Sequence, residues 1–264
     1  MLELILIIII LAFIFELMDS AAGMGFGTGL TPLLLIMGYS PLQIVPTLLI
    51  SESITGFIDA YFGNELKNVK FSFKPMSDAT KLALIIAFFG CIAIFFSILL
   101  TYVALELPTI FIKQYVAILV LGMGIFAIFR TRWKQKENVT SNLKLMVGFS
   151  VIAGFNKGIG GGGYGPVITL GQIHSGVYEK SATAIVSFSE AMVSVVGICT
   201  FLLITAVGVE VDLALLPSIF TGGFLAALLT PYLVRVLPNK MWRYIIPIYA
   251  IGIGIFLLLK IFVL

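Results

Sequence analysis

The sequence is poor in charge, histidine and cysteine, and each shortage excludes a class of protein. Only 11% of its 264 residues are charged, whereas 60% are hydrophobic. A soluble domain carries about 25% charged residues, so the composition excludes an ordinary soluble protein. The single histidine and the two cysteines, Cys91 and Cys199, have no metal-ligand or Cys-x-x-Cys spacing. We therefore expect no metal, no cofactor and no catalytic residue.

Long apolar runs take the place of the missing charge. A helix needs about 20 such residues to cross the hydrocarbon core of a bilayer. The runs also lack the alternation of polar and apolar residues found in membrane β-strands. The clearest are Leu42–Phe62, Leu82–Val103, Thr109–Phe129, Ala182–Val207, Leu213–Leu237 and Ile245–Leu259. We predict an all-α, multi-pass protein of the cytoplasmic membrane with one domain over residues 1–264 and no nucleic-acid partner.

The apolar run Leu4–Phe15, followed by Ser20-Ala21-Ala22, has some features of a signal peptide. It has Glu3 where a signal peptide carries Lys or Arg. It also leads directly into a glycine-rich segment. We expect this run to remain part of the mature structure.

Two glycine-rich segments that end in proline interrupt the apolar sequence. The first is Gly23–Pro32 and the second is Gly158–Pro166; the pairs Ser51-Glu52 and Ser189-Glu190 follow them. Broken backbone and acids at membrane depth are tolerated only where protein or a watery cavity surrounds them. Two copies in equivalent places indicate a transporter built from a duplicated unit, with repeat 1 over about 1–130 and repeat 2 over about 143–264.

Positive charges predict how the chain lies in the membrane. They gather in three loops, whereas the stretch Val207–Asp212 has none and contains Glu210. The positive-inside rule places the three loops in the cytoplasm and Val207–Asp212 outside. The charges are Lys67, Lys70, Lys74 and Lys81, then Arg130, Arg132, Lys134, Lys136 and Lys144, and finally Arg235, Lys240 and Arg243.

Eight plain crossings would put the second and third of these loops on opposite sides. The rule is satisfied if the segment around Gly158–Pro166 enters and leaves on the same side. The first half, Leu143–Asn156, would be only about 21 Å long as a helix, less than a core of about 30 Å. The same plan for Gly23–Pro32 gives two inverted repeats, each a re-entrant hairpin with three transmembrane helices. Eight plain helices remain the alternative, because Leu2–Leu17 is nearly long enough to span.

The glycine segments are candidates for an anion site. Glycine lets backbone N–H groups face a ligand, and a helix start at the membrane centre attracts an anion. Pro32 and Pro166 would suit the first turn of the helix that follows each loop. Close packing of helices through small residues is the alternative. The candidate binding residues are Gly25, Gly27, Thr28, Gly29, Asn156, Lys157, Gly160, Gly161, Gly162 and Gly163.

Lys157 is the only basic residue that this plan buries. It either binds the anion or pairs with Glu52, Asp19 or Glu190. These three carboxyls can load and unload a proton, which gives them a role in proton coupling or gating. Alternatively, they hydrogen-bond the backbone that the broken helices leave free.

The duplicated segment resembles the TauE/SafE sulfite exporter-like family, whose pattern is G-x-G-G-G-x-x-x-x-P. Gly158–Pro166 is similar except for the spacing to the proline, and Phe26 and Thr28 interrupt the glycines of Gly23–Pro32. The resemblance covers essentially the whole chain and implies transport of sulfite, an organosulfonate or a related anion.

We therefore expect a secondary transporter that holds a small sulfur oxyanion between the two glycine loops. A passive anion channel is the alternative within transport. An integral-membrane enzyme is disfavoured, since the sequence has no histidine cluster and no nucleotide P-loop ending. Besides the anion and the bilayer, a homo-oligomeric partner is compatible with the sequence but not required by it.

Overall fold

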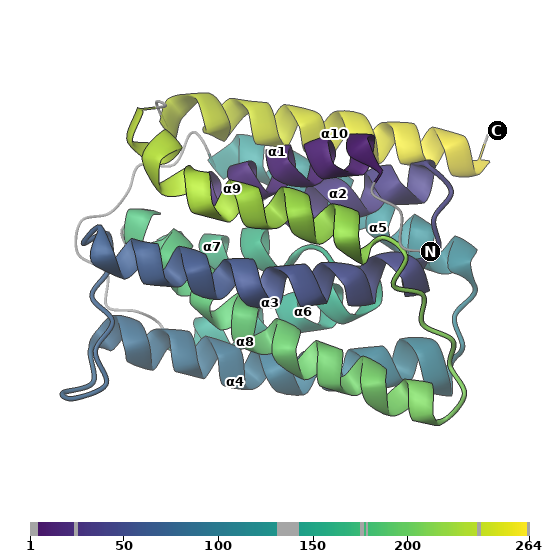
Figure 1. The fold of residues 1–264 in the computed structure, drawn as a ribbon, viewed down its shortest axis with the longest axis horizontal. Helices are drawn as coiled ribbons and strands as arrows, with labels where there is room; N and C mark the ends of the chain where they lie inside the picture. Colours follow the sequence, from purple (N-terminus) through teal and green to yellow (C-terminus); the bar gives the residue numbers. More distant parts are fainter. Residues whose placement is uncertain are drawn as a thin grey trace.

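The computed structural model describes residues 5–23, 26–130, 143–174, 177, 179–236 and 239–262, and its architecture is helical (Figure 1). The first half of the chain contains α1 (Leu6–Ala22), α2 (Phe26–Ile36), α3 (Pro41–Glu65), α4 (Asp78–Leu99) with its π-helical end η1 (Leu100–Ala104), and α5 (Thr109–Arg130). The second half contains α6 (Leu143–Gly160), α7 (Tyr164–His174), α8 (Glu179–Ala206), α9 (Leu216–Val236) and α10 (Asn239–Phe262).

Helix lengths agree with a membrane protein. Four helical segments are long and apolar enough to cross a bilayer: Pro41–Glu65, Asp78–Ala104, Thr109–Phe129 and Ser181–Ala206. Helices α9 and α10, with 21 and 24 residues, coincide with the last two predicted runs. The predicted all-α membrane fold is therefore confirmed.

Each glycine-rich segment breaks a helix into two pieces. Helix α1 has 17 residues and α2 has 11, which correspond to about 26 Å and 17 Å. Helices α6 and α7 have 18 and 11 residues. All four pieces are shorter than a core of about 30 Å.

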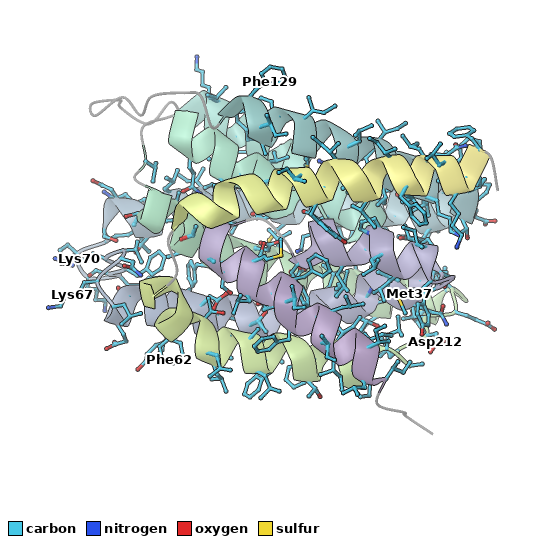
Figure 2. The ribbon with its side chains drawn as sticks, turned by 90° about the horizontal axis from the view of Figure 1, so that it is seen from above. Met37, Phe62, Lys67, Lys70, Phe129 and Asp212 are labelled. Atoms are coloured by element: carbon cyan, nitrogen blue, oxygen red, sulfur yellow. The ribbon has the colours of Figure 1, made fainter. Side chains whose placement is uncertain are left out.

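Hydrogen bonds show which helix ends lie together. The Ile5 N–H donates to Ser218 Oγ over 2.8 Å, so the start of α1 lies against the start of α9. The Gln43 amide donates to Asp212 over 2.7 Å, so α3 begins at the same end. Figure 2 shows Met37 and Asp212 together at this end of the molecule.

The first broken helix returns to the end at which it began. Lys260 Nζ donates to the Ile36 carbonyl over 2.5 Å and joins the end of α10 to the end of α2. The opposite end holds the loop after α3, where Ser181 Oγ donates to the Asn68 carbonyl over 2.8 Å. Lys67 lies at this opposite end in Figure 2. Helices α1 and α2 therefore form a hairpin whose two outer ends both lie at the Asp212 end.

The two halves of the chain exchange helices, in the sense that long helices of one half pack along helices of the other half. Helix α1 packs along α9, and α6 packs along α4. Helix α3 packs along α8, and α5 packs along α10. The counterparts by order along the chain are α1 and α6, α3 and α8, α4 and α9, and α5 and α10. If every helix is replaced by its counterpart, the same set of pairs results. The halves therefore share one core, in which Phe26, Leu30 and Tyr164 are buried.

The two prolines lie at different places in their helices. Pro166 is the third residue of α7, as predicted for a first turn. The same prediction is wrong for Pro32, because α2 begins at Phe26 and Pro32 is its seventh residue. Proline has no N–H, so the carbonyl of Thr28 lacks its usual partner four residues later.

Candidate functional site

The two glycine loops meet at the centre of the molecule, backbone against backbone. A Cβ added to Gly27 would collide with the Gly161 carbonyl, and one added to Gly162 would come within 2.6 Å of the Gly27 carbonyl. The Gly163 N–H donates to Thr28 Oγ1 over 3.0 Å. Glycine is therefore required here for close approach, as the packing alternative predicted.

A second contact joins the start of the first loop to α7. Gly23 ends α1 in the left-handed region, with φ +67°, and its N–H donates to the Asp19 carbonyl over 2.6 Å. Thr169 Oγ1 donates to the Gly23 carbonyl over 3.1 Å. A Cβ on Gly165 would come within 2.6 Å of this same carbonyl oxygen. The loops thus contact each other along their length in this conformation.

Side chains of α4 and η1 donate to carbonyls in the last two turns of the broken helix α6, including the Ile159 carbonyl, which has no partner within the helix. The last carbonyls of a helix have no partner within it. Ser97 Oγ donates to the Phe155 carbonyl over 2.7 Å, and the Tyr102 hydroxyl donates to the Ile159 carbonyl over 2.8 Å. These bonds hold the end of α6 in place and fix the position of Lys157, which lies between the two carbonyls.

Lys157 is fully buried between two carboxylates from different helices. Its ammonium group donates to Glu52 on α3 and, over 2.7 Å, to Glu190 on α8. Glu52 is 5% exposed and Glu190 is 7% exposed. The ammonium nitrogen also lies 5.7 Å from the ring centroid of Tyr164. The side chain therefore ties α6, α3 and α8 together at the level of the loops.

The Glu52 carboxylate also lies at the start of α2. It lies against Gly27, the second residue of that helix. A Cβ on Gly27 would lie 3.1 Å from Glu52 Oε1. A helix start with an adjacent ammonium group is the setting in which proteins bind anions. A carboxylate of the protein itself therefore occupies the place predicted for the anion.

Other predicted binding residues lie around this centre in packing roles. The Asn156 amide oxygen accepts from the Tyr115 hydroxyl, which joins α6 to α5. Gly29 lies against the Phe15 ring, and Gly160 lies against Val116. Gly25 lies outside the described residues.

Asp19 does not pair with Lys157; among the described residues, the ion pairs of Lys157 are with Glu52 and Glu190. The main charged neighbours of Asp19 are Glu190 and Glu52, followed by Asp59 on α3, and Glu16 on α1 in turn has Asp59 and Asp19 as its charged neighbours. Sequence reasoning missed Glu16. The signal was present, because Glu16 is an acid at the end of an apolar run and three residues from Asp19.

A membrane bundle with broken helices and buried charges at its centre has the architecture of a membrane transporter. The chain belongs to the sulfite exporter TauE/SafE family, whose match covers residues 8–257. It is 29% identical over 231 residues to "Probable membrane transporter protein YtnM" of Bacillus subtilis (strain 168). The aligned region covers 83% of this chain and 71% of that protein. No solved structure matches the chain. The protein is therefore a multi-pass membrane transporter and not an enzyme, and the predicted family is confirmed.

Proposed function

We propose that the protein is a secondary transporter that carries a small sulfur oxyanion, sulfite or an organosulfonate, together with a proton. The observation that carries the proposal is the position of the Glu52 carboxylate. It binds the Lys157 ammonium and lies against Gly27 at the start of α2. A carboxylate and a sulfur oxyanion both present negatively charged oxygens to such donors. The family name supports sulfite as the first substrate to test.

Exchange of Glu52 for the substrate requires a proton. If the substrate anion displaced an ionised Glu52, the carboxylate would lose its donors and remain buried as an uncompensated charge. A proton on Glu52 neutralises it and frees the ammonium group of Lys157 for the anion. For a singly charged anion, such as hydrogen sulfite or an organosulfonate, the charge within the site then stays the same, because one anion replaces another while the proton arrives with it. Binding of the anion and binding of the proton therefore favour each other.

The glycine loops have to part before an anion can reach this place. In the structure the Gly163 N–H is bound to Thr28 Oγ1, which stands where a substrate oxygen would accept the bond. The exchange of helices between the halves supports two inverted repeats that rock against each other, with the loops at their interface. In this proposal the loops separate toward one side of the membrane at a time.

Uptake of radiolabelled sulfite into proteoliposomes tests the function. We expect accumulation driven by a pH gradient, competition by an organosulfonate, and acidification of the lumen in step with the anion. Anion flux without proton movement would indicate a passive channel. Absence of any sulfur oxyanion flux would overturn the proposal.

Replacement of Glu52 by glutamine separates binding from coupling. Gln keeps the shape of the side chain but cannot exchange a proton, so we expect anion exchange to persist and accumulation driven by the pH gradient to be lost. Glu190→Gln is the matched control, because Glu190 binds the same ammonium group from α8. Normal gradient-driven accumulation in Glu52→Gln would exclude Glu52 as the coupling group.

A further inference from the structure

Three further carboxyls lie on α1 and α3, beside the Lys157 ion pairs. They are Glu16 and Asp19 on α1 and Asp59 on α3. Ser20 Oγ donates to Asp59 Oδ2 over 2.5 Å. The function proposed above assigns no role to these carboxyls.

Glu16 has an oxygen with no partner. Its side chain is only 2% exposed, and Oε2 lacks a hydrogen-bond partner. A buried carboxylate oxygen without a donor loses its hydration and gains nothing in return. A proton bound to this oxygen removes the negative charge and with it the cost of burying that charge. Glu16 Oε2 is therefore a candidate position for a bound proton.

The charges that face Glu16 have the same sign as its own carboxylate. They are Asp19 on α1 together with Asp59 and Glu52 on α3. The charged group that interacts with Asp59 is Glu190 on α8. Among the described side chains, neither α2 nor residues 216–230 of α9 contribute a titratable group. On α10, Tyr249 donates to the Gly29 carbonyl, and Lys260 lies at the end of the helix.

The buried charges of the centre do not balance. Lys157 is one ammonium, and it is already bound to Glu52 and Glu190. Glu16, Asp19 and Asp59 would add three further negative charges at membrane depth. Buried like charges that interact with one another do not all ionise together, so at least one proton resides among them.

We infer that Glu16 and Asp59 form a proton-binding site that exchanges protons with Glu52 and with the end of the molecule that carries Lys67 and Lys70. Asp59 lies two helical turns beyond Glu52 on the same face of α3, a distance of about 10 Å along the axis. Asp59 is half-buried, whereas Glu16 is buried. The proton enters at Asp59, resides on Glu16 and reaches Glu52 by transfer between neighbouring acids. This relay rests on the proton-coupled function proposed above.

Infrared spectroscopy of the purified protein tests the site without any transport. A protonated buried carboxylic acid gives a carbonyl-stretch band separate from the bands of ionised carboxylates. We expect Glu16→Gln to lose this band, and Glu65→Gln, at the exposed end of α3, to keep it. A band unchanged in Glu16→Gln and also in Asp59→Asn, both in monodisperse protein, would overturn the inference.

Transport by the same variants separates the two proposals. We expect Asp59→Asn to lose accumulation driven by a pH gradient and to exchange anion more slowly than the wild type, because the proton no longer reaches Glu52 through the relay. Wild-type gradient-driven accumulation in Asp59→Asn would overturn the relay even if Glu52 is the coupling group. If the wild type accumulated the anion in response to a sodium gradient, the coupled ion would be sodium rather than a proton, and the relay would be overturned. If the wild type moves no sulfur oxyanion, the proposed function fails while the infrared result still decides whether Glu16 holds a proton.

Discussion

Lys157 is the residue on which the free energy of burying the charges of the site depends most. A buried ammonium group is stable only when its partners stay in place, and removing one member of a buried pair costs about 3–5 kcal/mol. Here the partners, Glu52 and Glu190, come from two different helices. Stability and transport therefore depend on the same three side chains.

Replacing Lys157 by methionine should destabilise the protein by about 3–5 kcal/mol, because it leaves two carboxylates buried without a counter-ion. Thermal unfolding in detergent measures the loss as a lower melting temperature. The triple variant Lys157→Met, Glu52→Gln, Glu190→Gln should recover most of the stability but not the transport. A single variant that melts like the wild type would contradict the buried ion pairs.

The sequence was sufficient to single out Lys157, Glu52 and Glu190, because charged residues are rare in apolar runs and each had to be explained. It left open which carboxyls pair with Lys157. That choice depends on how α3, α6 and α8 pack, and no local pattern encodes it. Glu16 was missed because it ends an apolar run whose other residues suggested only a membrane helix.

At the scale of elements, the glycine loops combine two roles that the sequence analysis treated as alternatives. They allow backbone-to-backbone packing, and they place Gly27 against a carboxylate. Both roles follow from the absence of a Cβ. The start of α2 was not predictable from the sequence. Pro32 indicated a helix that begins near residue 32, whereas α2 begins at Phe26.

Gly162→Ala should destabilise the closed contact between the loops, because the new Cβ would come within 2.6 Å of the Gly27 carbonyl. Overpacking of this kind costs about 1–3 kcal/mol. Gly148→Ala, also in the second repeat but with open space around it, should stabilise α6 by up to about 1 kcal/mol. Melting temperatures and sulfite uptake of the two variants provide the comparison. Equal effects of the two substitutions would show that the loop contact is not tight.

At the scale of the whole molecule, hydropathy alone located the long membrane helices, because each is a continuous apolar run. The exchange of helices between the halves was not predictable in the same way. It depends on which faces meet, and contacts such as that of α1 with α9 join residues about 210 positions apart.

The topology is tested by cysteine labelling at two exposed positions in a variant without Cys91 and Cys199. We expect Glu210→Cys to react with a membrane-impermeant maleimide in intact cells, and Lys70→Cys to react only after permeabilisation. Between these positions the inverted plan has three crossings, made by α4, α5 and α8. Eight plain helices would add a fourth and put both cysteines on one side, so labelling of both in intact cells would reject the inverted plan.

The interleaving of the two halves has a consequence for how the protein is made. Glu52 and Glu16 are synthesised long before Lys157, which follows Glu52 by 105 residues. Helix α1 likewise has to wait for α9 before its packing surface is covered. During synthesis the first half therefore holds acids in or near the membrane without their counter-ion. Protons, rather than Lys157, have to neutralise those acids until α6 is inserted, so the nascent chain uses the same chemistry that the finished transporter is proposed to use.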